Sequence, residues 1–364
     1  MDRYAPYRAV ARSLGVEAVA LVPGPNFTRL MGKAFMSLER PFLVLVPEEG
    51  PPAAVVPNLE LRSFDLVGFE GEVFDWRDQD GYRAAFEALG ARYPLQRIAV
   101  EGQVMRVFVA KALEAAMPGL SLVDGEAAIS GLRIIKTGNE VAALEAAIRI
   151  SEAALAEVLA GVRIGDREQD VERRLVQALF GHGAEGLSFP ALVAAGDNSA
   201  RPHAHARPDY EIAAGDALLI DFGAVAGGFC ADITRTVFVG DPSREAQDVY
   251  TTVLAANRKG HEIARPGVTA HEIDDAVIGV LEASPYADRI RTKTGHGIGR
   301  EVHEAPYIMR GNHTPMEAGM VFTDEPGLYK IGAFGVRIED DIVIEEGGCR
   351  SLTSFERELM VIGC

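Results

Sequence analysis

The fold is decided by the stretch from Leu218 to Gly240, which reads LLIDFGAVAGGFCADITRTVFVG. Two apolar, β-branched runs flank the pair Gly227-Gly228, and this pattern predicts a buried β-hairpin with a small turn or bulge. Each run carries one acid, Asp221 or Asp232. A carboxylate inside an apolar strand is costly to bury unless a cation or a donor compensates it. Either acid alone could point to solvent, whereas a metal ion would compensate both.

The composition is that of a soluble globular protein with two domains. The chain has 364 residues, of which 48% are hydrophobic and 24% are charged. Its formal net charge of −17 argues against a nucleic acid or an anionic membrane as partner. Three cysteines, Cys230, Cys349 and Cys364, are too few for a disulfide framework, which fits a cytoplasmic location. We expect no signal peptide and no transmembrane helix, because neither pattern occurs.

Residues 1–125 are predicted to form an α/β domain. They contain no phosphate-binding glycine motif and no catalytic cluster, so we interpret this part as structural or substrate-shaping. The apolar patterns predict helices at 7–14, 80–93 and 105–117, and strands at 18–22, 42–46, 53–56 and 98–100.

A second domain is predicted over residues 126–364. Thr137 and Glu140 form a capping box, which opens a helix to about Leu159, and a second helix is expected at 167–180. A faint internal repeat follows, because another capping pattern at Thr269 opens a helix at 270–283. The acidic hairpin comes after the first helix pair, and the apolar stretch 321–344 comes after the second helix. Two similar halves suggest a site between them.

Five residues stand out as candidate metal ligands. His296 lies between glycines, Glu325 opens a Glu-Pro-Gly turn, and Glu339 directly precedes an apolar strand. With Asp221 and Asp232 they make four carboxylates and one imidazole, which suits a pair of divalent ions such as Mn²⁺, Co²⁺ or Zn²⁺. Two ions about 3.5–4 Å apart can share a water and lower its pKa towards about 7. The set therefore predicts hydrolysis of a carbonyl compound.

These residues carry a resemblance to a known family. The motifs are IDFG at 220–223, ADITRT at 231–236, GHGIG at 295–299, EVHE at 301–304, EPG at 325–327 and VRIED at 336–340. In this order they resemble the Xaa-Pro peptidases, aminopeptidase P and prolidase, within metallopeptidase family M24. The resemblance implies an α+β architecture. A pita-bread catalytic domain over 126–364 would follow a smaller, creatinase-like α/β N-terminal domain over 1–125.

The resemblance also implies a role for each ligand. Asp232 and Glu339 would bridge two metal ions, with manganese as the expected metal. Asp221 would complete the shell of one ion, and His296 and Glu325 that of the other. Glu325 would also act as general base towards a metal-bridging hydroxide or water, and would then pass the proton to the leaving nitrogen.

Four further residues match the family's site. His303 would hydrogen-bond the substrate carbonyl or the developing oxyanion. His203 matches an upstream histidine that stabilises the tetrahedral intermediate; His205, two residues away, is the alternative, and the Ala-Arg-Pro-His context favours His203. Arg337 would orient carboxylates or contact substrate, and Thr234 would be a minor ligand of the Asp221-side ion or would hold one of its ligands.

The expected protein is a cytoplasmic, homodimeric, dinuclear metallopeptidase that cleaves the bond between an N-terminal residue and proline. Dipeptides, as for prolidase, and longer peptides, as for aminopeptidase P, remain open as substrates. A metal-independent creatinase-type hydrolase and a non-catalytic peptide- or protein-binding relative are the alternatives. Among the departures from the family pattern, Asp324 precedes Glu325 where an apolar residue or Asn is usual. An additional acid there could repel Glu325 or support it.

Overall fold

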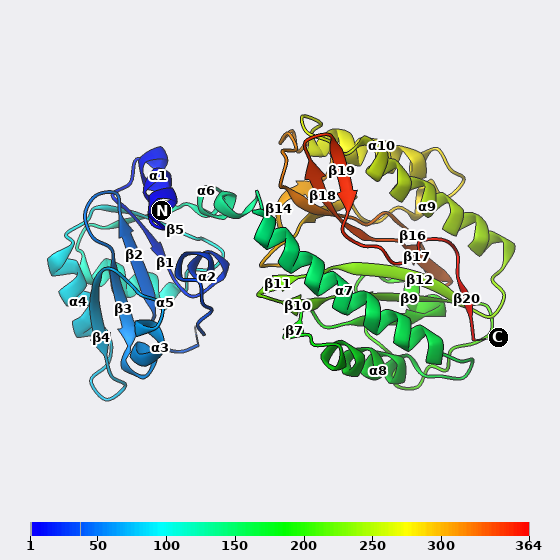
Figure 1. Cartoon of the computed structure of the whole chain (residues 1–364), viewed down its shortest axis with the longest axis horizontal. Helices are drawn as coiled ribbons and strands as arrows, with labels where there is room; N and C mark the ends of the chain where they lie inside the picture. Colours follow the sequence, from blue (N-terminus) through cyan, green and yellow to red (C-terminus); the bar gives the residue numbers. More distant parts are fainter. Residues whose placement is uncertain (1, 37, 364) are drawn as a thin grey trace. The chain divides into compact units, whose positions relative to one another are not determined.

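The computed structural model describes residues 2–36 and 38–363, so Cys364 lies outside the described residues. The chain divides into two compact units, residues 1–133 and residues 134–364 (Figure 1). Within the described part of the chain, no helix is both long enough and apolar enough to cross a membrane.

The first unit is built on one six-stranded sheet with the order β4-β3-β2-β1-β5-β6. Its strands are β1 (Ala18–Leu21), β2 (Leu43–Pro47), β3 (Ala53–Pro57), β4 (Glu72–Trp76), β5 (Arg97–Val100) and β6 (Ser121–Asp124). Its helices are α1 (Ala5–Leu14), α2 (Pro25–Met31), α3 (Leu61–Asp65), α4 (Arg83–Arg92), α5 (Val107–Ala116) and α6 (Glu126–Ser130). The three predicted helices and four predicted strands are confirmed, although α4 begins three residues later than expected.

Both faces of this sheet are buried under helices. Along β1, Val19 and Leu21 pack in a cluster with residues of α1, α2 and α3, whereas Ala18 and Ala20 pack with residues of α4 and α5. Successive side chains of a strand point to opposite faces. The alternation therefore makes the first unit a three-layer α/β structure, in agreement with its apolar strand sequences.

The second unit places two strand systems between helix pairs. Its helices are α7 (Gly138–Gly161), α8 (Glu168–Gly181), α9 (Arg244–Ile263) and α10 (Ala270–Glu282). The larger sheets have the orders β20-β12-β9-β8 and β14-β13-β15-β18-β19. Their strands are β8 (Leu192–Ala195), β9 (Asp216–Phe222), β12 (Ile233–Val239), β13 (Gly295–Gly297), β14 (Glu304–Ile308), β15 (Val321–Asp324), β18 (Asp340–Glu345), β19 (Gly348–Ser351) and β20 (Val361–Ile362). Smaller sheets contain β7 (Gly186–Leu187), β10 (Ala224–Ala226), β11 (Phe229–Cys230), β16 (Gly327–Lys330) and β17 (Phe334–Arg337).

The predicted hairpin is confirmed, with its turn at the glycine pair. Ala226 pairs with Phe229 across β10 and β11. Gly227 and Gly228 between them have φ values of 57° and 72°, so the turn needs residues that tolerate positive φ. The outer strands β9 and β12 continue the pairing in a different sheet. The acidic hairpin therefore has a short end formed by β10 and β11 and a long buried part formed by β9 and β12.

The internal repeat is visible in the order of elements. The helix pair α7 and α8 precedes the antiparallel strands β9 and β12, and the helix pair α9 and α10 precedes the antiparallel strands β15 and β18. In Figure 1 the two helix pairs lie on opposite sides of the strands. Both capping boxes occur as predicted, at Thr137 and Thr269. The four candidate acidic ligands lie on or next to these strand pairs, so each half of the unit contributes two of them.

Candidate metal centre and active site

The predicted ligands lie at the ends of strands near the middle of the second unit. Asp221 is on β9, where it pairs with Thr234 of β12. Glu339 directly precedes β18, and its backbone N–H donates to the carbonyl oxygen of Thr234 over 3.1 Å. Asp232 directly precedes β12. A backbone contact between the two halves thus sets the ligands of one half beside those of the other.

Three of the five predicted ligands form a tight buried cluster. One ligand atom from each of Asp232, His296 and Glu339 lies within 4.8 Å of the others. Glu325 follows β15 and adjoins the cluster, because its Oε1 is 3.4 Å from Nε2 of His296. Asp221 is held next to this cluster by Arg337, because Nη2 of Arg337 donates to Oδ2 of the Asp221 carboxylate. The sequence-predicted set is therefore brought together in space.

Without a bound cation, the ionised forms of these buried carboxylates are costly. Burial, followed by the negative charges of neighbouring acids, raises the pKa of Asp232 and of Glu339 well above their ordinary range. Burial raises the pKa of Glu325 from 4.5 to about 7, with Arg337 opposing this rise and Asp221 adding to it. Like charges held at a buried site each favour the protonated form of the other.

The same donor set fits divalent cations. Burial lowers the pKa of His296 to about 3, so the imidazole is neutral, as a metal ligand must be. Its Nδ1 lies 3.2 Å from the carbonyl oxygen of Gly297, which can only accept, so Nδ1 carries the hydrogen and Nε2 presents a lone pair to the acids. Among the described residues, the buried Oδ1 of Asp221 has no hydrogen-bond partner. A carboxylate oxygen without a partner and a neutral imidazole in one cavity are what a cation site requires.

A buried hydrogen-bonded chain holds the carboxylates in place. The hydroxyl of Thr234 donates to Oε2 of Glu339 over 2.6 Å and accepts from Nε of Arg337 over 2.9 Å. Nη1 of Arg337 donates to the hydroxyl of Tyr329 over 2.9 Å. The Thr234 hydroxyl therefore contacts the carboxylate of Glu339, and it is linked to the carboxylate of Asp221 through Arg337. Tyr329 was not expected here, because nothing local to it signals a polar partner.

The predicted histidines line the same cavity as the ligands. This cavity has a volume of about 680 Å³ and includes His203, His303 and all five predicted ligands. The His303 ring lies 4.1 Å from the His296 ring between centroids. His205 is absent from the lining, and its carbonyl oxygen accepts from the side chain of Asn198. The geometry thus favours His203 over His205.

Sequence reasoning missed the remaining walls of the cavity. Phe189, Pro202 and Val302 supply apolar surface, and Arg291 and Lys293 supply positive charge. The walls come from separate segments, and no local pattern marks a residue as a wall. Arg291 and Lys293 are the exception, because they place positive charge five and three residues before the ligand motif at His296.

Asp324 points away from the cavity towards α9. Its carboxylate occupies the space where a Cβ on Gly260 would lie, since that atom would be 2.2 Å from Oδ2 of Asp324. Neither carboxylate oxygen has a hydrogen-bond partner among the described residues. Burial, followed by the charge of Asp340, raises its pKa well above the ordinary range. The departure from the family pattern is thus accommodated by a glycine notch in α9.

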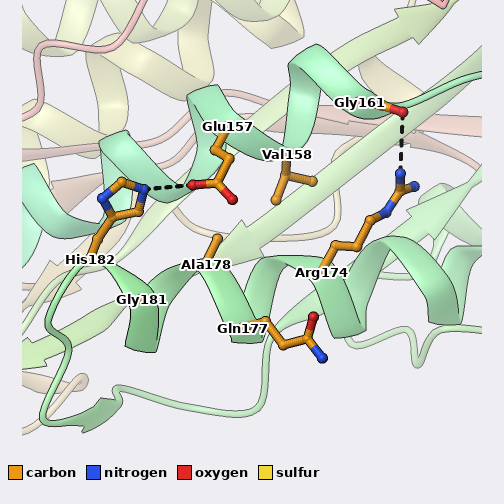
Figure 2. A pocket seen from close by; sticks show the side chains of 8 residues that line it. All are labelled: Glu157, Val158, Gly161, Arg174, Gln177, Ala178, Gly181 and His182. Atoms are coloured by element: carbon orange, nitrogen blue, oxygen red, sulfur yellow. Dashed lines mark hydrogen bonds and ion pairs between the residues drawn. The ribbon is translucent and has the colours of Figure 1, made fainter.

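A second cavity lies outside this centre, between α7 and α8 (Figure 2). It has a volume of about 300 Å³. Nε2 of His182 is 2.9 Å from Oε2 of Glu157 there, and Nη1 of Arg174 donates to the carbonyl oxygen of Gly161 over 3.2 Å. None of its lining residues is a predicted ligand. The candidate ligands and histidines therefore all belong to the cavity of about 680 Å³ and not to this one.

Comparison with known proteins agrees with this centre. The model of metallopeptidase family M24 matches residues 142–346, and that of the creatinase/prolidase N-terminal domain matches residues 4–135. An Xaa-Pro dipeptidase of Pyrococcus furiosus is 39% identical over 232 residues, which are 64% of this chain and 66% of that protein.

Solved structures resemble the whole chain. A prolidase from Thermococcus sibiricus has a TM-score of 0.93 and 33% identity, covering 99% of this chain and 98% of that chain. An X-Pro aminopeptidase from Thermotoga maritima has a TM-score of 0.85 and 28% identity, with 100% of each chain covered. The α+β fold, with a creatinase-like N-terminal domain and a pita-bread catalytic domain, is thereby confirmed. The chain belongs to metallopeptidase family M24 and is a peptidase of that family.

Proposed function

We propose that this peptidase hydrolyses the bond between an N-terminal residue and a following proline, using two divalent metal ions. The observation that carries the proposal is one cavity lined by five potential ligands and two histidines, in a chain similar to proteins named prolidase and X-Pro aminopeptidase. Asp221, Asp232, His296, Glu325 and Glu339 would hold the ions. When bound, the ions supply Lewis acidity, which lowers the pKa of a water molecule towards about 7 and polarises a carbonyl.

The chain's own residues move the proton. Glu325 lies at the cavity wall and beside the ligand cluster, so it accepts a proton from the attacking water. As the new carbon–oxygen bond forms and the carbon–nitrogen bond breaks, Glu325 returns this proton to the proline nitrogen. The proline nitrogen has no hydrogen of its own in an Xaa-Pro bond. Delivery of a proton to that atom is therefore the step the enzyme must supply.

His203 and His303 stabilise the negative charge that develops on the scissile oxygen. Burial, followed by the charge of Lys293, lowers the pKa of His303. A neutral imidazole still donates one N–H, and a donor preset towards an oxyanion contributes about 10²–10³ in kcat. Phe189, Pro202 and Val302 provide the apolar surface against which a proline ring can pack.

Metal-restored cleavage tests the proposal. Metal-stripped protein is incubated with Gly-Pro and with a Gly-Pro-Yaa tripeptide, with and without Mn²⁺, Co²⁺ or Zn²⁺. We expect cleavage only with metal, and the dipeptide-to-tripeptide ratio separates prolidase from aminopeptidase P activity. Full activity after complete metal removal would favour the creatinase-type alternative. Failure to bind metal or to cleave either peptide would favour a non-catalytic binding protein.

The histidine roles have a matched pair of variants. His203→Ala is expected to lower kcat by about 10²-fold, because it removes one donor to the oxyanion. His205→Ala, two residues away and outside the cavity lining, is expected to stay within about twofold of the wild type. The reverse order would reassign the role to His205.

Further expectations stay predictions. We propose Mn²⁺ as the resident metal because the donors are mostly carboxylates. Assembly as a homodimer, which light scattering after size-exclusion chromatography would measure, is also proposed, as is a cytoplasmic location. The expected boundary between domains at residues 125 and 126 remains a prediction too.

A further inference from the structure

Lys293 brings a positive charge without a counter-ion into the active-site cavity. It lies on the segment between residues 289 and 295 that leads into β13, and it lines the same cavity as Glu325 and His303. No ion pair or hydrogen bond joins its ammonium group to any residue that the structure describes. Its Nζ lies over the ring of Tyr307, 5.6 Å from the ring centroid. A cation with an unused charge at a substrate site is available for an anion.

The other cations of the cavity already make hydrogen bonds. Arg337 donates to Asp221, Thr234 and Tyr329. Arg291 is exposed, and its Nη1 donates to the carbonyl oxygens of residues 288 and 290 in its own turn, at 2.5 and 2.7 Å. Lys293 is partly buried, and it is the cation of this lining that makes no hydrogen bond to a described residue.

The metal centre does not need the charge of Lys293. Two divalent ions would carry four positive charges, which match the four carboxylates of Asp221, Asp232, Glu325 and Glu339. With those ions bound, the ammonium group of Lys293 would remain uncompensated. Its charge nevertheless lies at the centre, because Lys293 lines the same cavity as all five predicted ligands.

The substrate offers one anion at the corresponding place. In an Xaa-Pro dipeptide, the free carboxylate belongs to the proline itself, and consecutive Cα atoms are only about 3.8 Å apart. The carboxylate therefore lies within one residue of the bond that breaks. In a longer peptide a neutral amide takes that position. A lone ammonium group in the same cavity distinguishes these two substrate classes by charge.

Resting on the proposed function, we infer that Lys293 binds the free carboxylate of the proline residue and makes Xaa-Pro dipeptides the preferred substrates. The ammonium group donates a charge-assisted hydrogen bond to the carboxylate, which is stronger than a neutral one. Lys293 thereby determines specificity, while the metal ligands and histidines carry the chemistry. The assignment favours the dipeptidase over the aminopeptidase activity.

The test compares a free acid with its amide. kcat/KM is measured for Gly-Pro and for Gly-Pro amide with the Mn²⁺-loaded wild type and with Lys293→Gln. We expect the wild type to favour the acid, and the acid-to-amide ratio to fall about 10- to 100-fold in the variant, mainly through KM for the acid. Lys293→Arg keeps the charge and is expected to retain most of the ratio. Melting temperatures of all variants check that they are folded.

Lys259→Gln is the matched control, because Lys259 is a lysine of α9 paired at 3.1 Å with Glu262. It is expected to leave the ratio unchanged. An unchanged ratio in Lys293→Gln, or a wild type that cleaves acid and amide equally well, would overturn the inference while leaving Xaa-Pro cleavage intact. Cleavage of neither substrate by the wild type would overturn the proposed function, and the inference with it.

Discussion

We predict that Glu325→Gln stabilises the metal-free protein at neutral pH. Glu325 sits beside Asp221 and Glu339 in the proposed metal site, and its side chain is only 16% exposed, so solvent screens its charge little. The rise of its pKa from 4.5 to about 7 corresponds to about 3 kcal/mol, because one pKa unit is worth about 1.4 kcal/mol. Glutamine keeps the shape of the side chain and removes this cost.

The sign of the pH dependence follows from the direction of the shift. Between pH 4.5 and about 7 the folded state retains the proton of Glu325, whereas the unfolded state releases it. The free energy of unfolding of the wild type therefore falls as pH rises through this window. The variant lacks this contribution, so its advantage grows from near zero at pH 4.5 to about 3 kcal/mol above pH 7. His296, whose pKa shift acts in the opposite direction, is present in both proteins and cancels.

The assay is thermal unfolding in a chelating buffer at several pH values between 4.5 and 8. About 1 kcal/mol shifts Tm by about 2–4 °C in a domain of this size, so the variant is expected to melt about 6–12 °C higher above pH 7. With saturating Mn²⁺ the order is expected to reverse, because the wild type gains binding energy that the variant partly lacks. A variant no more stable than the wild type at pH 8 without metal would refute this electrostatic account.

Three other changes probe the framework around the site. Gly260→Ala is expected to cost about 1–3 kcal/mol of unfolding free energy, because the new Cβ would meet Asp324, and adding Asp324→Ala should recover it; additive losses in urea unfolding would contradict the contact. Lys136→Met removes the ammonium group that lies 3.2 Å from the buried carboxylate of Glu304 and is expected to cost about 3–5 kcal/mol, whereas a Tm change below 2 °C would show that the pair is dispensable. Thr137→Ala removes the capping box of α7 and is expected to cost about 1 kcal/mol with unchanged kcat, and a loss of activity without a loss of Tm would argue against a purely structural cap.

Local patterns marked the candidate ligands because each lies in a short motif. His296 stands between glycines, and Glu339 directly precedes a strand, so both are marked by neighbours in the chain. The capping boxes at Thr137 and Thr269 depend on residues three apart and were equally readable. The fold class followed, since the hairpin, the helix starts and the motifs all agreed.

Other features depended on tertiary contacts. The importance of Lys293 emerges only when the cavity shows which cations are already engaged. The notch at Gly260 is invisible without Asp324 opposite it. Strand β4 was missed because it is mostly exposed, including Val73, so it has no buried apolar run. Helix α9 was missed although its buried positions, such as Val249 and Val253, follow a helical spacing that was readable.

Counting bound metal ions while activity returns tests the central claim most directly. Metal-stripped protein would be titrated with Mn²⁺, and the number of ions bound per chain would be followed together with the hydrolysis of Gly-Pro. We predict two ions per chain, with hydrolysis appearing as the sites fill, and loss of both ion binding and hydrolysis in Asp232→Asn. Hydrolysis that is complete before any ion binds, or a chain that binds both ions and leaves every Xaa-Pro peptide intact, would contradict the account.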